Sequence, residues 1–177
     1  MSSALLFDLD GVLLDNPAIS EYIADKSVRY LQKYARVPVR YKTYENMKQL
    51  NQMAYKNLGH TALIVDDTRA GVWNYNNYVF DNETLDFVKH TINNSDRRRI
   101  LDIADTLISY NNDVAVGLCT NTPLTYCNAV FDGLVYDMNK LFTLCFTSDI
   151  GFLKPSDNFY EHVEQELEND FSRIYFL

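Results

Sequence analysis

The stretch ALLFDLDG, residues 4–11, decides the fold of this 177-residue chain. Its apolar residues run from Ala4 to Leu9 and would occupy both faces of a strand, which is typical of a strand buried in a parallel sheet. Asp8, Asp10 and Gly11 fall at the end of this run. Taken alone, a pair of aspartates after a strand is more often a turn than a catalytic site.

Three further apolar runs follow in the second half of the chain. Strands are predicted at residues 114–119, 141–146 and 174–177. The ranges between them carry apolar residues at helical spacing behind capping residues. Helices are predicted from Ser95 or Asp96 to about residue 110, from Pro123 to Leu134, and from Ser156 or Asp157 to Leu167. Strands that alternate with helices predict an α/β fold, with a Rossmann-like three-layer αβα core around a parallel sheet.

Residues 16–94 interrupt this alternation. Apolar residues recur at helical spacing after Pro17, along Met47 to Leu58 ahead of Gly59, and across residues 83–93. Residues 66–82 are polar and aromatic, and are predicted to form a loop with one or two helical turns. We therefore expect a core of residues 1–15 and 95–177, and a mostly helical lobe of residues 16–94 inserted after the first strand.

Composition and charge narrow the class of protein. The chain is 47% hydrophobic and 23% charged, with a formal net charge of −8, which is typical of a soluble globular protein and unfavourable for binding nucleic acid. No basic, long apolar leader opens the sequence, so neither a signal peptide nor a membrane span is predicted. Its three cysteines have no CxxC spacing and fit a reducing compartment, and a cytoplasmic protein is expected.

Polar clusters stand at the carboxyl ends of predicted strands or just after them. They are Asp8-Leu9-Asp10-Gly11, Thr120-Asn121 and Lys154-Pro155. Ligands of open parallel sheets bind at this edge, so we expect the three clusters to meet there. An aspartate can attack phosphorus, and a second acid with a raised pKa can exchange protons with the leaving group and with water. Each cluster alone would also fit an ordinary turn, helix cap or loop.

The order and chemistry of the clusters resemble motifs I, II and III of the haloacid dehalogenase (HAD) superfamily, over a span from Leu5 to Leu177. This resemblance implies a phosphatase in which Asp8 is the nucleophile and Asp10 the general acid and base. It implies that the phosphoryl group is bound by Thr120, through its hydroxyl and backbone N–H, and by Asn121 and Lys154. Mg²⁺ is the implied cofactor, held by the Asp8 carboxylate, the Asp10 backbone carbonyl and an acidic residue of motif IV.

Motif IV follows the fourth strand in this superfamily, and the segment Arg173 to Leu177 resembles the strand that leads to it. Two interpretations stay open: the sequence is a C-terminally incomplete fragment of a longer product, or it is a degenerate member that lacks motif IV. The run from Ala62 to Asp67 imitates motif IV with Asp66-Asp67. Because it precedes motif II, it is assigned to the inserted lobe.

The insert between motifs I and II resembles the superfamily's C1-type cap, a helical lid that excludes water and contacts the substrate. A small phosphorylated metabolite is the expected substrate. The segment Tyr55-Lys56 with Gly59-His60-Thr61 resembles pyrimidine nucleotidase-like members, which makes nucleotide monophosphates one candidate beside sugar phosphates. Two alternatives remain: a phosphomutase or phosphotransferase on the same site, and a catalytically inert binding protein. Neither nucleic acid nor a membrane is an expected partner.

Overall fold

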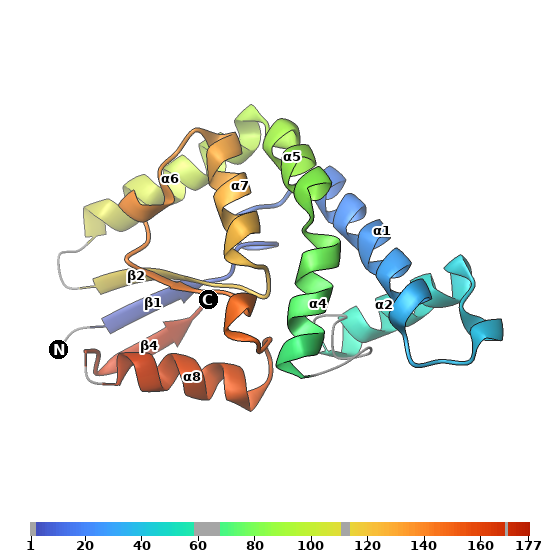
Figure 1. Ribbon diagram of the computed structural model, residues 1–177. Helices are drawn as coiled ribbons and strands as arrows, with labels where there is room; N and C mark the ends of the chain where they lie inside the picture. Colours follow the sequence, from blue (N-terminus) through green and yellow to red (C-terminus); the bar gives the residue numbers. More distant parts are fainter. Residues whose placement is uncertain (1–2, 59–67, 111–113, 169) are drawn as a thin grey trace.

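The computed structural model of the chain describes residues 3–58, 68–110, 114–168 and 170–177. In this described part, a parallel sheet of four strands has the order β3-β2-β1-β4 (Figure 1). The strands are β1 (Ser3–Phe7), β2 (Val114–Cys119), β3 (Leu144–Phe146) and β4 (Arg173–Phe176). β1 is central, since Leu5 aligns with Val116 of β2 on one side and with Tyr175 of β4 on the other.

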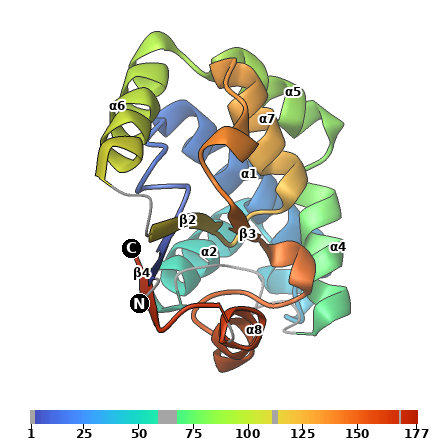
Figure 2. The ribbon, with the colours of Figure 1, turned by 90° about the vertical axis from the view of Figure 1, so that its left-hand side faces the viewer.

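Helices cover both faces of the sheet and give three layers (Figure 2). On one face lie α6 (Asn94–Tyr110) and α7 (Leu124–Leu134), and on the other lies α8 (Asp157–Leu167). Alternate residues of β1, Ala4 and Leu6, are fully buried against Phe159 and Val163 of α8. The predicted α/β fold, with a Rossmann-like core and a parallel sheet, is therefore confirmed.

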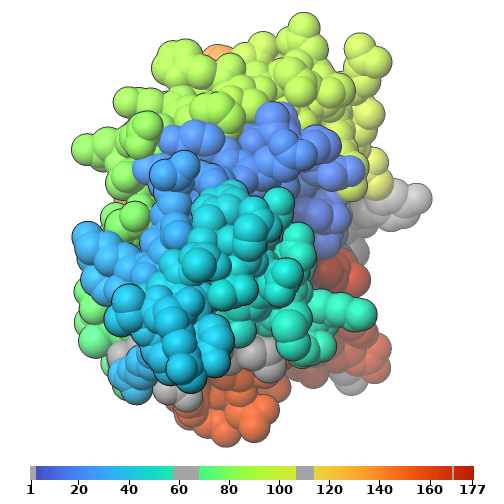
Figure 3. Space-filling view, turned by 90° about the vertical axis from the view of Figure 1, so that its right-hand side faces the viewer, coloured from blue at the N-terminus to red at the C-terminus, as the bar shows by residue number. Residues whose placement is uncertain are grey.

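The described part of residues 16–94 contains helices and no strand. These helices are α1 (Pro17–Tyr34), the short η1 (Val39–Tyr41), α2 (Tyr44–Leu58), α4 (Arg69–Val79) and α5 (Asn82–Thr91). The carboxyl ends of the strands point toward the lobe of α1, α2 and α4 (Figure 1), and α1 and α2 form much of its outer surface (Figure 3). α5 packs on α7, so one hydrophobic core runs through both. The division into two domains at residues 15/16 and 94/95 stays a prediction.

One stretch predicted as a loop with one or two helical turns contains a longer helix. α4 spans 11 residues within the range 66–82. The Thr68 side chain caps it by accepting a hydrogen bond from a backbone N–H of the first turn, and Val72, Asn76 and Val79 are buried along one face. The prediction was wrong because this face contains a polar residue: Asn76 Nδ2 donates to Ser148 Oγ at 2.8 Å. Apolar spacing alone does not reveal a helix that is buried through such a contact.

Two predicted boundaries also shift. β3 begins at Leu144 rather than at residue 141, because the two N–H groups at 141 and 142 donate to Met138 O in the turn of the short helix η2 (Met138–Lys140). Asn93 caps α6 in place of the predicted Ser95 or Asp96, whose N–H groups both donate to its Oδ1. Among the described helices, none is both long enough and apolar enough to span a bilayer.

Candidate active site

Asp8 follows directly on β1, at the edge of the sheet that faces the lobe. Its N–H donates to Leu177 O at 3.0 Å, and its Oδ1 accepts from the Leu9 N–H at 2.8 Å. The chain then turns tightly: Gly11 has a φ of 83°, which residues with a Cβ rarely adopt, and its N–H donates to Leu14 O at 2.7 Å. This turn holds Asp10 close enough to Asp8 for their charges to interact.

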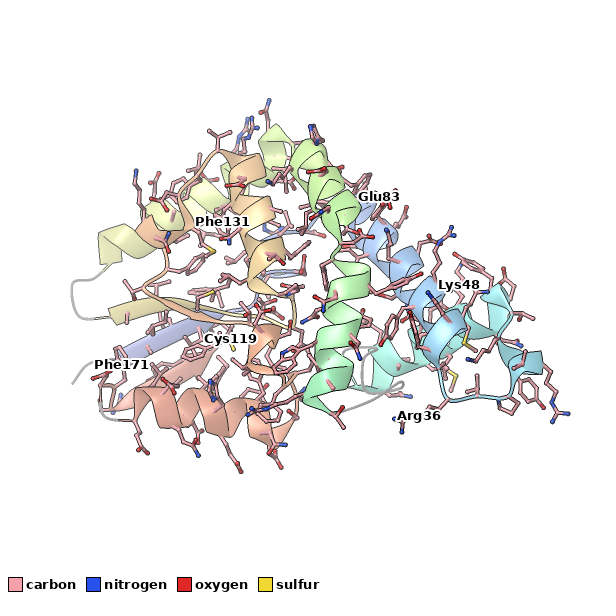
Figure 4. The ribbon with its side chains drawn as sticks, viewed as in Figure 1. Arg36, Lys48, Glu83, Cys119, Phe131 and Phe171 are labelled. Carbon is pink, nitrogen blue, oxygen red and sulfur yellow. The ribbon has the colours of Figure 1, made fainter. Side chains whose placement is uncertain are left out.

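Lys154 joins the ends of β1 and β2. Its Nζ lies 3.0 Å from Asp8 Oδ2 and donates to Cys119 O, the last carbonyl of β2, at 2.7 Å. Figure 4 marks Cys119 at this end of the sheet. The lysine side chain is only 16% exposed and that of Asp8 is 34% exposed, so the ion pair is screened less than a surface pair. The first and third clusters of the sequence therefore meet.

Asn121 fixes the backbone at Lys154. Its Oδ1 accepts from the Lys154 N–H at 2.6 Å, and its Nδ2 donates to Lys154 O at 3.0 Å. This two-way contact joins the second cluster to the third. It leaves Asn121 with one Nδ2 proton for a ligand, so its direct part in phosphate binding stays a prediction.

Thr120 is buried, with 1% of its surface exposed. Its N–H donates to Phe146 O at 2.9 Å and continues the pairing of β2 with β3. The N–H expected to bind phosphate is thus already used, and the Thr120 hydroxyl, 3.0 Å from Thr122 Oγ1, is the group that remains. Thr120 and Thr122 both line the floor of the cavity that opens at this edge of the sheet.

Tyr126 is a site residue that the sequence did not reveal. Its hydroxyl donates to Asp10 Oδ1 at 2.7 Å, and its ring is fully buried, 5.2 Å from the ring of Phe80. Burial and the nearby Asp10 raise the pKa of Tyr126 well above 10, so the hydroxyl keeps its proton and remains a donor. The sequence indicates Tyr126 only as a phenol on the helix that follows the second cluster, and this indication is weak by itself.

Asp10 titrates near neutrality. Burial raises its pKa from 3.8 to about 6, and the charge of Asp8 adds to this increase. The Tyr126 hydrogen bond and the Lys154 charge act in the opposite direction, because both favour the carboxylate. A carboxyl group with a pKa in this range can both donate and accept a proton at physiological pH.

Asp149 is a second residue that the sequence did not reveal. It lies in the short helix η3 (Ser148–Ile150), and its Oδ2 accepts from the Leu124 N–H at 2.6 Å at the start of α7. Its backbone oxygen accepts from Trp73 Nε1 of α4 at 3.1 Å. Asp149 thus caps the helix that carries Tyr126 and ties that helix to the lobe.

A cavity of about 720 Å³ opens above these residues, within the range that holds small organic ligands. Its floor is formed by Asp8, Asp10 and residues 120–122, and its walls by the lobe together with Leu153, which lies between η3 and α8. The wall residues are Ser20, Ile23, Ala24, Ser27, Asn51, Gln52, Tyr55, Lys56, Tyr75, Phe80 and Leu153. The lobe therefore closes over the carboxyl edge of the sheet and would surround a substrate bound there.

The oxygen atoms at the floor of the cavity fit a hard cation. Among the residues that the structure describes, no three His, Cys, Asp or Glu side chains gather as a ready-made metal site. Asp8 and Asp10 supply carboxylate and carbonyl oxygens, the ligand type that Mg²⁺ prefers while it keeps several waters and binds phosphate oxygens. Asp66-Asp67 and Gly59-His60-Thr61 lie outside the described residues.

No protein-family model matches the sequence, and no curated protein sequence matches it. Solved structures do resemble the fold. A HAD-hydrolase, YfnB from Bacillus subtilis bound to magnesium, shares 20% identity over 97% of this chain and 74% of its own, with a TM-score of 0.50. CbbY from Rhodobacter sphaeroides in complex with phosphate shares 17% over 99% and 77%, with a TM-score of 0.53. A CbbY variant in complex with xylulose-(1,5)bisphosphate shares 16% over 95% and 73%, with a TM-score of 0.50.

Proposed function

We propose that this chain, which has the fold of the HAD-like hydrolases, is an enzyme that hydrolyses a small phosphate monoester through a phosphoryl group carried on Asp8. One observation supports this most: two carboxylates in different environments share the floor of one cavity. Asp8 is paired with Lys154, whereas Asp10 has a pKa of about 6. Such a difference between neighbouring carboxyl groups is how enzymes separate an acid from a nucleophile.

In the first half of the proposed reaction, an Asp8 carboxylate oxygen attacks phosphorus. The bond from phosphorus to the leaving oxygen breaks, and protonated Asp10 gives that oxygen its proton. The Lys154 ammonium, 3.0 Å from Asp8 Oδ2, would offset the charge of the phosphoryl oxygens, and the hydroxyl of the cavity-lining Thr120 would donate to one of them. Partial burial of both carboxylates under the lobe would strengthen these interactions.

In the second half, water attacks the phosphorus of the aspartyl-phosphate. Asp10, now ionised, takes a proton from the water, and the bond between Asp8 and phosphorus breaks to release inorganic phosphate. Tyr126 is a positioning residue for both halves of the reaction. Its hydroxyl donates a hydrogen bond to Asp10 Oδ1, so Asp10 carries its own acidic proton on Oδ2. The CbbY structures with phosphate and with a sugar bisphosphate support a phosphorylated small molecule as the substrate.

Mg²⁺ would be held by oxygen atoms of Asp8 and Asp10 and would supply positive charge to the phosphoryl group. Release of phosphate from phenyl phosphate is expected to stop with a chelator and to return with Mg²⁺. A phosphoryl group transferred to an added sugar, instead of to water, would identify a phosphotransferase. If Mg²⁺ and a panel of phosphate monoesters yielded no phosphate, the proposed activity would be wrong and an inert binding protein would be favoured.

Tyr126→Phe is expected to move the alkaline limb of the pH profile of kcat/KM upward by about one pH unit. The hydrogen bond from Tyr126 lowers the pKa of Asp10, so its loss keeps the acid protonated to higher pH. The exposed Tyr41 of η1 gives the control variant, Tyr41→Phe, which should leave the profile in place. An unshifted limb in Tyr126→Phe would show that this contact does not tune the acid.

A further inference from the structure

A buried polar atom on α2 has no partner in the described part of the chain. Asn51 is 8% exposed and lines the cavity. Its Oδ1 accepts no hydrogen bond from any of the described residues. Burial of an acceptor without a partner destabilises a fold, and such an atom in a cavity wall is a candidate for ligand contact.

Two neighbouring polar groups of this wall, Ser27 and Tyr75, contact each other. Ser27 Oγ donates to Ile23 O at 2.9 Å, and Tyr75 OH lies 2.7 Å from the same oxygen. Since the single Ser27 proton is already used, Tyr75 is the donor in that contact. Ser27 and Tyr75 thus have each other as partners, in contrast to Asn51 Oδ1 on the facing helix.

The rest of the wall is largely uncharged. Ile23, Ala24, Phe80 and Leu153 give it apolar surface, and the aromatic rings of Tyr75 and Phe80 lie on it. Of the described lining residues, Lys56 is the one cation, and it is exposed. The lining acids in the described part are Asp8 and Asp10 at the floor. This wall would suit a leaving group that is uncharged and has an apolar face.

We propose that Asn51 determines specificity: its Oδ1 accepts a hydrogen bond from an N–H or O–H of an uncharged leaving group that has an apolar face. This inference rests on the proposed function, and it names the substrate class of the same site. The leaving group of a nucleoside monophosphate has both an apolar face and a hydrogen-bond donor. That of phenyl phosphate has an apolar face but no donor, and that of glycerol phosphate has donors but no apolar face. These three esters are the probes for the test.

The test is Asn51→Leu, measured as kcat/KM for each ester and as Kd for each ester on an Asp8→Asn background. We expect uridine monophosphate to lose about tenfold in both readouts, because its donor loses the acceptor. Phenyl phosphate should change less than about twofold, since it has no donor to lose. The melting temperature should not fall, because the substitution removes an unsatisfied buried acceptor. Gln49→Leu, at an exposed position of α2 outside the cavity lining, is the matched control and should change none of these.

Equal losses for uridine monophosphate and phenyl phosphate, or no loss for either, would overturn the role of Asn51. If only glycerol phosphate lost kcat/KM and affinity, the inference that the leaving group has an apolar face would be wrong. If the wild type released no phosphate from any ester, the proposed function would fail by itself. The Kd values would still decide on Asn51, since selective weakening of uridine monophosphate supports the inference and no binding, or equal binding, contradicts it.

Discussion

Asp10→Asn is expected to lower kcat by about 10²- to 10⁴-fold and yet to make the protein harder to unfold near neutral pH. The loss of activity follows because the amide can neither give a proton to the leaving oxygen nor take one from water. Greater stability follows because the amide has the shape of the neutral carboxyl group and keeps an oxygen that accepts from Tyr126. Function and stability would thus change in opposite directions at one residue.

The pH dependence of this effect has a definite sign. The pKa of Asp10 is raised in the folded protein from 3.8 to about 6. Between these values the folded state binds more protons than the unfolded state, so the free energy of unfolding of the wild type falls as pH rises through this window. Asn does not titrate. The stability advantage of Asp10→Asn should therefore be absent below about pH 4 and reach on the order of 3 kcal/mol above about pH 7.

Urea unfolding in metal-free buffer across this pH range measures the effect, because a bound cation would change the titration of Asp10. Asp105→Asn, at an exposed carboxyl of α6, is the control and should follow the wild type at every pH. If the free energies of unfolding of Asp10→Asn and the wild type differed by the same amount at every pH, burial would not raise the pKa of Asp10.

Lys154→Met is expected to lower kcat/KM by about 10²- to 10³-fold. The substitution keeps the unbranched stem but removes the ammonium that contacts Asp8 Oδ2 and Cys119 O. Phosphate would then approach two carboxylates with no nearby lysine to offset their charge. Because Lys154 also lowers the pKa of Asp10, the alkaline limb of the pH profile should move upward in this variant.

The control for this variant is Lys140→Met, which removes an exposed lysine of η2 and should leave both the rate and the profile unchanged. If Lys154→Met lost activity but the alkaline limb of its pH profile did not move, Lys154 would bind phosphate without affecting the pKa of Asp10. Activity within about threefold of the wild type would contradict the place of Lys154 in the site.

The fold could be predicted from the sequence where local pattern and burial agree. β1 and β2 are short apolar runs on the inside of the sheet. β2 has the predicted bounds, and β1 spans Ser3–Phe7 within the region where the pattern predicted Ala4 to Leu9. α4 could not be found in this way, because Asn76 is buried through a contact with Ser148, which is remote in sequence. The spacing of apolar residues predicts helices that have an apolar face. It cannot predict a helix face that is buried through a polar contact with a residue remote in sequence.

The site could be predicted in outline for the same reason. Parallel strands bring their carboxyl ends to one edge, so Asp8, Asn121 and Lys154 meet as the order of the clusters implied. Tyr126 was missed because a phenol on an apolar helix is usually core, and only the structure places its hydroxyl on Asp10. The expected use of the Thr120 N–H was wrong because the sheet ladder already engages it.

The central claim is that Asp8 carries the phosphoryl group, and acid quenching during turnover of phenyl phosphate tests it directly. Mass spectrometry of the quenched wild type should find one phosphoryl group on the peptide that contains Asp8, labile to hydroxylamine as an acyl phosphate is. Asp8→Asn should show neither the adduct nor turnover. An unmodified peptide during full turnover, with activity retained in Asp8→Asn, would contradict the account.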